Sequence, residues 1–308
     1  MMKAAYICQQ GGPEVFNYGD LPNPTAEAGH IVVDIHAASV NAADWKVRSG
    51  NYNKITKFPH ILGRDFSGVV AEIGDGVTDL AVGDPVFGVL EAGQEGAYAE
   101  KVSVRADIIA PKPAHLSHQE AVSLALTGLT AIVSLEDSLR LQAGETILIQ
   151  GGAGGVAGFA IQLAKHIGAT VVTTASSENH EYVAGLGADQ VIDYRTQDFA
   201  EILSGIDAVF ETVGGDIARR SFDVLRPGGR AAFIASGNSA PKPRRNDVTA
   251  YRPSVGRARR IMERVGELVS VSAVRLPAIR AFPLSAASEA HRISEARHLQ
   301  GKLVLNVH

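Results

Sequence analysis

The sequence has little cysteine and no large excess of either charge, and these shortages exclude several classes of protein. Cys8 is the only cysteine among 308 residues, so neither an intrachain disulfide nor a thiolate cluster around a metal can form. A reducing compartment suits such a chain. The formal net charge is −4, with 20% charged residues, which gives no general attraction for a polyanion. We therefore expect an ordinary globular protein with no nucleic-acid partner.

Long apolar runs are also scarce. The first residues, MMKAAYICQQGG, lack the apolar stretch of a signal peptide, and no later run approaches the roughly 20 apolar residues of a membrane span. One basic stretch runs from Lys242 to Arg260, but proline, glycine and acidic residues interrupt it, which is typical of a solvated face. We expect a cytoplasmic protein with no membrane partner.

Two hydrophobic patterns divide the chain, whose length favours two domains. Up to about residue 115, short β-branched runs such as HIVVDIHAAS and FSGVVAEIG alternate with glycine, proline and aspartate turns, which predicts a β-barrel. From about Glu120, apolar strands alternate with helices, as in a parallel sheet covered by crossover helices. Its predicted strands are 146–150, 170–174, 190–193, 208–212 and 230–235. We predict domains over 1–119 and 120–252, with a segment, 253–308, that returns to the first domain.

The segment TILIQGGAGGVAGFAIQLAK runs from a buried strand through a glycine turn into an amphipathic helix. Its Gly152, Gly154 and Ala157 match a dinucleotide-binding fingerprint: a tight turn, a close approach to a pyrophosphate and close helix packing. The pyrophosphate would contact free N–H groups at the helix start. The predicted cofactor contacts there are Gly152, Ala153, Gly154, Gly155 and Val156. The alternative is a glycine-rich turn without a ligand.

The end of the second predicted strand indicates which dinucleotide binds. An NAD site carries an acid there for the ribose hydroxyl, but this chain has the uncharged segment 174–177. Side chains that can donate hydrogen bonds to a 2′-phosphate are Ser176, Ser177, His180 and Tyr194. We therefore predict NADP(H) as the cofactor. Two alternatives stay open: Ser177 only caps the following helix, or Glu178 serves as the NAD-type acid.

Several segments spread over nearly the whole chain carry a family likeness. They are SVNAADWKVRSGNY, FPHILGRDFSGVV, VGDPVFG, GAYAE, LTGLTA, GETILIQGGAGGVAGFAIQLAK and AHRISEARHLQGKLVLNV. With these the chain resembles the medium-chain dehydrogenase/reductase superfamily, in its zinc-free quinone oxidoreductase and zeta-crystallin-like group. Ala157 replaces a glycine usual in that group. The resemblance implies an α/β protein with a GroES-like β-barrel domain and a Rossmann domain, NADPH between them, and a homodimer.

The zinc-dependent alcohol dehydrogenases of the same superfamily differ at their metal ligands. Where they carry a cysteine and a His-Glu pair, this chain has Asn41 and Arg64-Asp65. A catalytic zinc needs three protein ligands and an open position, so we predict no metal. The four-cysteine structural zinc lobe is also missing. We expect Arg64 and Asp65 to form an ion pair with each other.

A reductase without a metal suits a conjugated acceptor. When hydride adds to a quinone or an enone, the negative charge spreads to an oxygen that hydrogen bonds can stabilise. The resemblance includes the barrel residues Asn41, Asp44, Arg48 and Tyr52. It implies Tyr52 as the donor to the substrate oxygen or the nicotinamide carboxamide, with Asn41 beside it. The alternative is that Tyr52 only lines the pocket, and Asp44 and Arg48 are expected to pair within their loop.

The resemblance also places Thr127 at the nicotinamide ring and Ala235 with Ser236 along the cofactor cleft. His291 and Lys302 are expected to be structural. The predicted function is NADPH-dependent, zinc-independent reduction of a small quinone or α,β-unsaturated carbonyl. Two other hypotheses remain: an NADPH-binding or sensing protein with little turnover, and a zinc-type alcohol dehydrogenase, which Asn41 and Arg64 disfavour.

Overall fold

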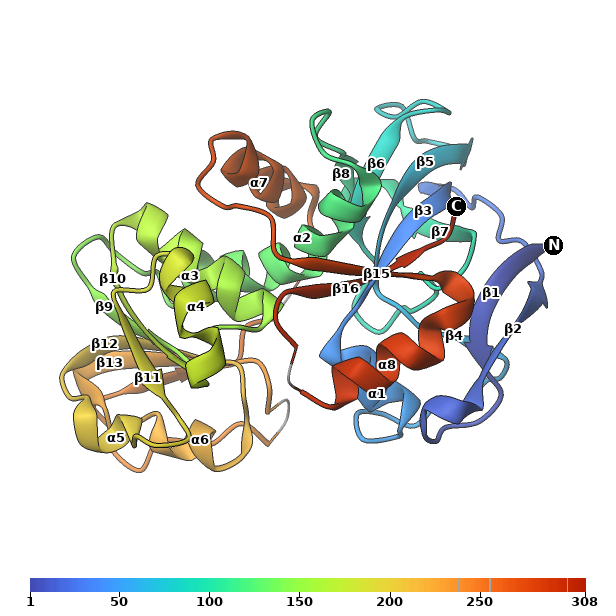
Figure 1. Ribbon diagram of the computed structural model, residues 1–308. Coiled ribbons are helices and arrows are strands. Elements are labelled where there is room, and N and C mark those ends of the chain that lie inside the picture. The colour runs from blue at the N-terminus through green and yellow to red at the C-terminus, as the bar shows by residue number, and fades with distance from the viewer. Residues whose placement is uncertain (237–238, 255, 298) are drawn as a thin grey trace. The chain divides into compact units, whose positions relative to one another are not determined.

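The computed structural model describes every residue except 237–238, 255 and 298, and the chain divides into two compact units. Unit 1 comprises Met1–Leu126, Gly256–Ser270 and Leu276–His308, and unit 2 comprises Thr127–Val255 and Val271–Arg275. The first and last parts of the chain, blue and red in Figure 1, therefore belong to the same unit. The first division falls inside helix α2 (His118–Ile132), seven residues beyond the predicted limit at 119.

The strands of unit 1 form two sheets. A three-stranded sheet has the order β2-β1-β4, with β1 at Met2–Ile7, β2 at Phe16–Leu21 and β4 at His60–Ile61. A seven-stranded sheet follows the path β15-β16-β3-β5-β6-β8, with β7 paired to β3. Its strands are β3 (His30–Val40), β5 (Asp65–Ile73), β6 (Pro85–Val89), β7 (Lys101–Arg105), β8 (Ala110–Pro111), β15 (Ile279–Pro283) and β16 (Lys302–Asn306).

Strand β3 organises this larger sheet. It pairs with β5 along one side, and its other side is shared by β7 at 30–34 and β16 at 37–40, all antiparallel. Ile31, Val33 and Ile35 of β3 are fully buried in the core, at the alternate positions that share one face of a strand. Residues 302–306 therefore complete the sheet that residues 30–40 begin.

Helices close the rest of unit 1. They are α1 (Ala42–Arg48), α7 (Arg259–Ser270) and α8 (Ala287–Glu295), with short 3-10 turns η1 (Pro13–Val15), η2 (Ala106–Ile108) and η6 (Leu284–Ala286). Helix α1 packs against α8. Trp45, the only tryptophan, is 5% exposed in α1, and the cationic groups of Lys46 and Arg297 lie 5.8 and 5.3 Å from its ring.

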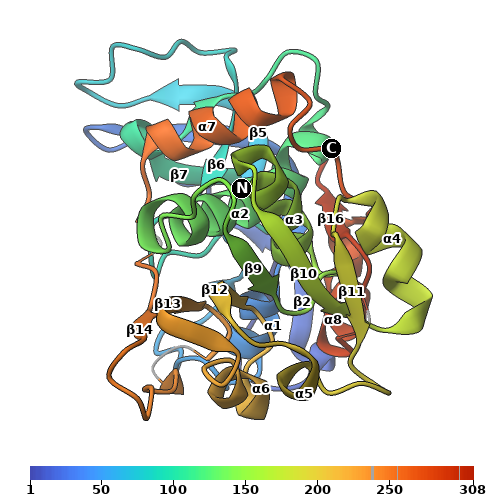
Figure 2. The same cartoon turned by 90° about the vertical axis from the view of Figure 1, so that its left-hand side faces the viewer.

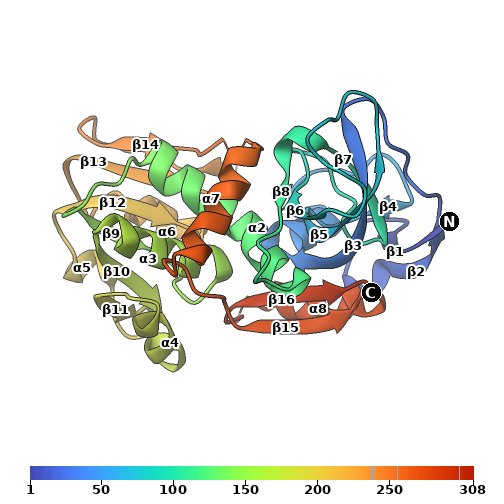
Figure 3. The same cartoon turned by 90° about the horizontal axis from the view of Figure 1, so that it is seen from above.

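Unit 2 contains a six-stranded parallel sheet with the order β11-β10-β9-β12-β13-β14. Its strands are β9 (Thr146–Ile149), β10 (Thr170–Ala175), β11 (Gln190–Asp193), β12 (Ile206–Glu211), β13 (Leu225–Phe233) and β14 (Thr249–Tyr251). Figure 3 shows β11 and β14 at its two edges. This doubly wound order is that of a Rossmann fold and confirms the predicted fold class.

Helices cover both faces of this sheet. Figure 2 shows α3 (Gly155–Ile167) and α4 (His180–Gly185) on one side, and α5 (Phe199–Ile202) and α6 (Gly215–Arg220) on the other. Because both faces are covered, β9 is apolar throughout its centre, where Ile147, Leu148 and Ile149 are all fully buried. Gly168 ends α3 with a left-handed φ of 96°, as predicted.

Helix α2 continues into a π-helical turn, η3 (Val133–Ser138). Together, His118–Ser138 are long and apolar enough to cross a membrane by length and composition alone, contrary to the prediction that no run would qualify. However, 78% of this apolar window is buried within the structure, as is common for a core helix of a soluble protein.

Candidate functional site

The glycine turn of unit 2 has the shape that a dinucleotide requires. A Cβ on Gly152 would lie 2.4 Å from Oγ1 of Thr173, so no larger residue fits without moving the turn. Gly151 has a φ of +74°, which glycine adopts without strain. Gly154 is the N-cap of α3, and the described side chains provide no cap there. The first turn of α3 therefore presents backbone N–H groups to a ligand.

Neighbouring strands hold this turn in place. The Gly151 amide donates to Oγ1 of Thr174 at 3.0 Å, and that hydroxyl donates to Oε1 of Gln150 at 2.8 Å. The Thr212 hydroxyl donates to the Gln150 carbonyl oxygen at 2.7 Å. The turn is thus fixed by β10 and by the end of β12, before any ligand arrives.

Near the strand ends of this sheet lie three buried polar atoms that have no partner among the described residues. They are Nε2 of Gln150, Oγ of Ser236 and Nε2 of His180. Gln150 follows β9, Ser236 follows β13 by three residues, and His180 opens α4 after β10. Buried polar groups are normally hydrogen-bonded, so three orphaned atoms at the ligand-binding edge of a Rossmann sheet indicate a polar ligand. The residues present fit a dinucleotide.

The structure places the predicted phosphate residues at the ends of two neighbouring strands. In the register of β10 and β11, Ala175 is opposite Asp193, so Ser176 and Tyr194 follow adjacent strand ends. Ser176 is 4% exposed and accepts a hydrogen bond from Asn179 Nδ2 at 3.0 Å, whereas Ser177 is exposed. The Ser177 hydroxyl caps neither η4 (Ser177–Asn179) nor α4 within the described chain, where no side-chain cap is present.

One residue of this edge, Arg195, was missed from the sequence. Its Nη1 donates to Oε1 of Glu178 at 2.7 Å, and its guanidinium carbon lies 6.0 Å from the centre of the Tyr194 ring. The hydrogen bond from Arg195 lowers the pKa of the Glu178 carboxyl. The sequence does carry a signal for it, because this cation follows the predicted strand end at 193 by two residues, next to Tyr194.

The remaining predicted cofactor residues also lie in unit 2. Thr127, 3% exposed, is the first residue of the unit and belongs to α2. Ala235 and Ser236 follow β13, and the Ala235 side chain lies where a Cβ on Gly214 would meet it at 3.5 Å. Ala157 is 1% exposed in α3, so alanine serves the close-packing position of the turn.

In unit 1, the predicted residue Asn41 is the N-cap of α1 and lies in a buried polar cluster. Its Oδ1 accepts from Nζ of Lys302 at 2.6 Å, and its Nδ2 donates to Oδ1 of Asp65 at 2.8 Å. Ser39 donates to the other Asp65 oxygen at 2.7 Å. Burial raises the pKa of the Asp65 carboxyl and lowers the pKa of the Lys302 ammonium, each opposed by the charge of the other.

The predicted ion pair between Arg64 and Asp65 is wrong. Arg64 instead donates to Oε1 of Glu95 at 3.1 Å and lies 3.6 Å from Oδ1 of Asp44. Because neighbours in an extended segment point to opposite faces, Asp65 turns to the buried cluster and Arg64 does not. The Arg64 guanidinium lies 5.1 Å from the centre of the Tyr52 ring, and Tyr52 is 58% exposed.

The expected loop pair of Asp44 with Arg48 is also wrong. Asp44 is fully buried and accepts hydrogen bonds from the Tyr98 hydroxyl at 2.9 Å and from the backbone N–H of Asn41 at 2.8 Å. Arg48 donates to Glu295 of α8 at 2.6 Å. Tyr98 and Glu295 are distant in the sequence, because both side chains point into the core instead of along their own helix. Burial raises the pKa of the Asp44 carboxyl to about 7, although the charge of Arg64 opposes this.

His291 of α8 joins this network. Its Nε2 lies 3.2 Å from the Tyr98 hydroxyl and its Nδ1 3.4 Å from Arg48 Nη1. Burial, assisted by the charge of Arg48, lowers the pKa of the imidazole to about 3. These contacts agree with the expected structural role.

The residues at the family's zinc positions do not fit a zinc ion. The Asn41 carbonyl already accepts from an ammonium, and Arg64 is itself a cation. Only Asp65 is an anionic donor, and both its oxygens accept hydrogen bonds. In the described part of the chain, no group of three His, Cys, Asp or Glu residues is arranged to hold a metal. A catalytic zinc needs three ligands of that kind.

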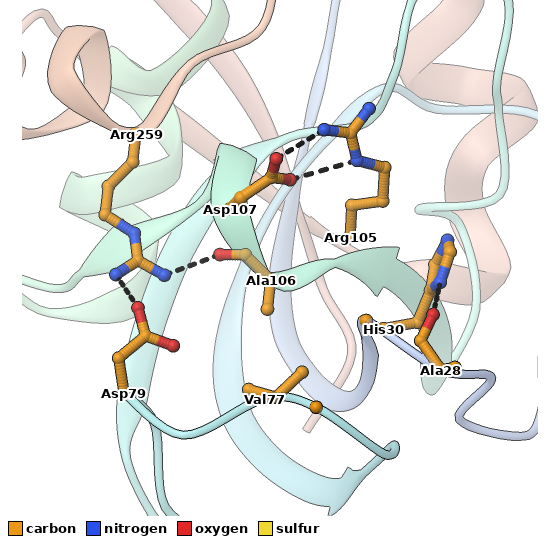
Figure 4. A pocket seen from close by; sticks show the side chains of 10 residues that line it. Ala28, His30, Val77, Asp79, Arg105, Ala106, Asp107 and Arg259 are labelled. Atoms are coloured by element: carbon orange, nitrogen blue, oxygen red, sulfur yellow. Dashed lines mark hydrogen bonds and ion pairs between the residues drawn. The ribbon is translucent and has the colours of Figure 1, made fainter.

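A surface depression of about 690 Å³ lies elsewhere in unit 1 (Figure 4). Arg259 pairs there with Asp79 and donates to the Ala106 carbonyl oxygen at 2.7 Å, and Arg105 pairs with Asp107. None of the predicted site residues line it. We assign it no role in the function proposed below.

Known proteins match along the whole chain. Residues 27–114 match the alcohol dehydrogenase GroES-like domain, and residues 186–305 match the zinc-binding dehydrogenase family. The NADPH-dependent alkenal/one oxidoreductase of Arabidopsis thaliana chloroplasts is 31% identical, over 99% of this chain and 79% of that protein. The quinone oxidoreductase of Coxiella burnetii is 36% identical with a TM-score of 0.91, over 100% of this chain and 99% of that one.

A third relative was solved with a cofactor. The Escherichia coli quinone oxidoreductase in complex with NADPH is 27% identical with a TM-score of 0.90, over 99% of this chain and 100% of that one. The chain belongs to the medium-chain dehydrogenase/reductase superfamily, among its quinone oxidoreductases and alkenal reductases. The predicted family is therefore confirmed.

Proposed function

We propose that this protein is an NADPH-dependent reductase of quinones or α,β-unsaturated carbonyls that works without zinc. The observation that carries the proposal is the glycine turn shaped by Thr173, next to strand ends that bear orphaned polar atoms. The names of its relatives support the substrate class, since they include an alkenal/one oxidoreductase and quinone oxidoreductases. The donor set around Asn41 supports the absence of zinc.

The cofactor-binding residues would divide among three parts of NADPH. The backbone N–H groups of 152–156 would hold the pyrophosphate at the start of α3. The 2′-phosphate would contact side chains that follow β10 and β11, namely Ser176, Ser177, His180 and Tyr194. Thr127, Ala235 and Ser236 would line the nicotinamide end, where the Ser236 hydroxyl has no partner among described residues.

Bound NADPH supplies the hydride. The protein must then stabilise the charge that develops on the acceptor oxygen, and Tyr52 can do so because it carries a hydroxyl donor and is 58% exposed. The Arg64 guanidinium carbon lies 5.1 Å from the centre of the Tyr52 ring, so a positive charge is held beside the side chain that would face the developing anion. Asn41 has both ends of its amide engaged, so we assign it a positioning role: it holds Asp65 and Lys302 together beside the start of α1.

We also propose that the protein acts in the cytoplasm as a homodimer. A single, exposed cysteine suits a reducing compartment. Light scattering on the purified protein tests the dimer, and a mass of about 32.4 kDa would show a monomer.

The function is tested by measuring NADPH oxidation with a panel of quinones, enals and enones, with NADH in parallel and with a chelator present. We expect turnover with NADPH that the chelator does not change. Stoichiometric zinc in the purified protein, or loss of activity with the chelator, would overturn the zinc-free reaction. NADPH binding without oxidation by any member of the panel would instead identify a binding protein.

A further inference from the structure

An exposed ion pair lies at the edge where the proposed function places the 2′-phosphate. Arg195 and Glu178 are 44% and 66% exposed, and their Nη1 and Oε1 atoms are 2.7 Å apart. Glu178 belongs to η4, directly after β10, and Arg195 follows β11 by two residues. These two strands are parallel neighbours, so the pair bridges adjacent carboxyl ends of the sheet.

We propose that Arg195 is a specificity-determining residue for the 2′-phosphate, and that Glu178 occupies its guanidinium as an internal anion until the phosphate replaces it. The inference rests on the proposed function and adds a ligand that the predicted set lacks. It also gives Glu178 a role other than that of an acid for the ribose hydroxyl.

The exchange is favourable because the two partners of Arg195 differ in strength. An ion pair between exposed side chains contributes little, since water and salt screen it and both side chains lose freedom. A phosphate monoester carries more negative charge than a carboxylate and three acceptor oxygens, and a guanidinium binds it through two parallel hydrogen bonds. Replacing Glu178 by phosphate therefore loses a weak contact and gains a stronger one.

The surroundings prepare Arg195 for this exchange. Its guanidinium lies 6.0 Å from the centre of the Tyr194 ring, an attractive arrangement that limits where the side chain can go. His180 opens the helix that follows Glu178, and its Nε2 is buried without a partner among the described residues, so it is a further polar atom at this edge that a ligand would satisfy.

The ion pair also explains how the two cofactors would be distinguished. NADH has a ribose hydroxyl in place of the phosphate, and a neutral hydroxyl cannot displace Glu178 from Arg195. The pair then stays closed when NADH binds. Arg195 therefore contributes to NADPH binding alone, and the carboxylate of Glu178 limits that contribution.

The experiment measures equilibrium dissociation constants for NADPH and NADH by fluorescence, without any acceptor. The variants are Arg195→Gln, Glu178→Gln and the double variant. Lys165→Gln is the matched control, because Lys165 forms an ion pair of similar exposure with Asp189, 2.8 Å long, at the amino ends of the same strands. It removes one positive charge from the unit, as Arg195→Gln does.

We expect Arg195→Gln to weaken NADPH binding about tenfold or more and to leave NADH binding unchanged. Glu178→Gln should tighten NADPH binding about two- to fivefold, and this gain should shrink once Arg195 is also replaced. Lys165→Gln should change neither constant.

Three results would overturn the exchange. Unchanged NADPH binding in Arg195→Gln removes Arg195 from the site. An equal gain from Glu178→Gln with and without Arg195 shows direct repulsion of the phosphate and no competition. An equal loss in Lys165→Gln shows a general effect of charge. Failure of the wild-type protein to bind NADPH would instead overturn the proposed function itself.

Discussion

At the residue scale, Gly152 and Gly154 of the turn are expected to differ in their contribution to stability. A Cβ on Gly152 meets Thr173 Oγ1 at 2.4 Å, whereas one on Gly154 meets the Gly151 carbonyl oxygen at 3.4 Å, with a φ of −73° that alanine adopts freely. Gly152→Ala should therefore destabilise unit 2 by about 1–3 kcal/mol and abolish NADPH binding. Gly154→Ala should weaken binding, because the cofactor approaches there, with stability changed by less than about 1 kcal/mol.

Urea denaturation and NADPH titration of the two variants check this pair of predictions. Equal loss of stability in both would show that the contact with Thr173 does not decide the shape of the turn. Full NADPH affinity in Gly154→Ala would place the pyrophosphate elsewhere.

Tyr52 provides a second prediction at this scale. Tyr52→Phe removes the hydroxyl and keeps the ring beside Arg64, so we expect kcat with an enone to fall about 100-fold. The KM for NADPH should stay unchanged, because Tyr52 is not among the proposed cofactor ligands. Tyr18→Phe, at another half-exposed tyrosine of unit 1, is the matched control. Steady-state kinetics test both, and an unchanged kcat in Tyr52→Phe would show that its hydroxyl does not stabilise the acceptor oxygen.

The sequence predicted features that depend on neighbouring residues, but it did not predict which distant side chains form ion pairs and hydrogen bonds. The glycine turn and the hydroxyls after β10 could be read from the sequence because each depends on a few consecutive residues. The pairs expected for Arg64 with Asp65 and for Asp44 with Arg48 were wrong. Asp65 instead accepts from Ser39 of β3 and from Asn41, while Arg48 pairs with α8 and Arg64 with Glu95, all of which lie far away in the sequence.

At the element scale, the starts of three strands of unit 2 were predicted well: β9, β10 and β11 begin where expected. β9 has a continuous apolar run, because a buried strand of a parallel sheet needs apolar residues on both faces. β10 and the edge strand β11 are marked instead by their β-branched residues. β13 begins at Leu225, five residues early, since its PGG segment is typical of a turn and hides the strand. β14 was missed, because three residues of low burial leave no pattern.

Strand β16 leads to a prediction about the sheet of unit 1. It lies between β15 and β3, and its Lys302 holds Asn41. Ending the chain after Gly301 would leave one side of β3 unpaired at 37–40 and the Asn41 side-chain carbonyl without its donor. We expect unit 1 to lose its native structure, seen as exposure of Trp45 by fluorescence. Removal of His308 alone is the control, and a truncated chain that keeps the native emission would contradict the prediction.

At the scale of the whole molecule, the two-unit organisation followed from length and from the change of hydrophobic period. The position of the boundary between the units did not follow from them, because it falls inside the single helix α2, where the helical pattern of apolar residues is continuous. Both units are built on sheets whose strand order depends on contacts between distant segments. Family resemblance supplied that order, since composition and periodicity alone allow several.

The pH dependence of global stability is a prediction at this scale. Burial raises the pKa of Asp44 from 3.8 to about 7. Between these values the folded protein keeps a proton that the unfolded chain releases, so raising the pH lowers the free energy of unfolding. Above about pH 7, Asp44 is ionised in both the folded and the unfolded state, and its effect on the free energy of unfolding no longer changes with pH. Asp44→Asn keeps an acceptor for Tyr98 and removes this titration.

The free energy of unfolding of Asp44→Asn, minus that of the wild type, should therefore rise from about pH 4 to about pH 7 and then level off. Urea denaturation across this range measures it. His118 and His291, whose pKa values burial lowers to about 4 and about 3, act equally in both proteins and cancel. Asp107→Asn is the control, because Arg105 lowers the pKa of that carboxyl and its effect is confined to lower pH. A difference that does not vary with pH would refute the buried titration of Asp44.

The interior position of β16 has a consequence for the order of events during synthesis. A ribosome makes the chain from its N-terminus, so the continuous part of unit 2 is complete before residues 302–306 exist. The nascent β3 must hold one edge open at 37–40 throughout this time, until Val40 can pair with Leu303. Open strand edges invite association with other chains, and long-range pairing is slow. Unit 1 is therefore the last part to mature and the part in greatest need of a chaperone.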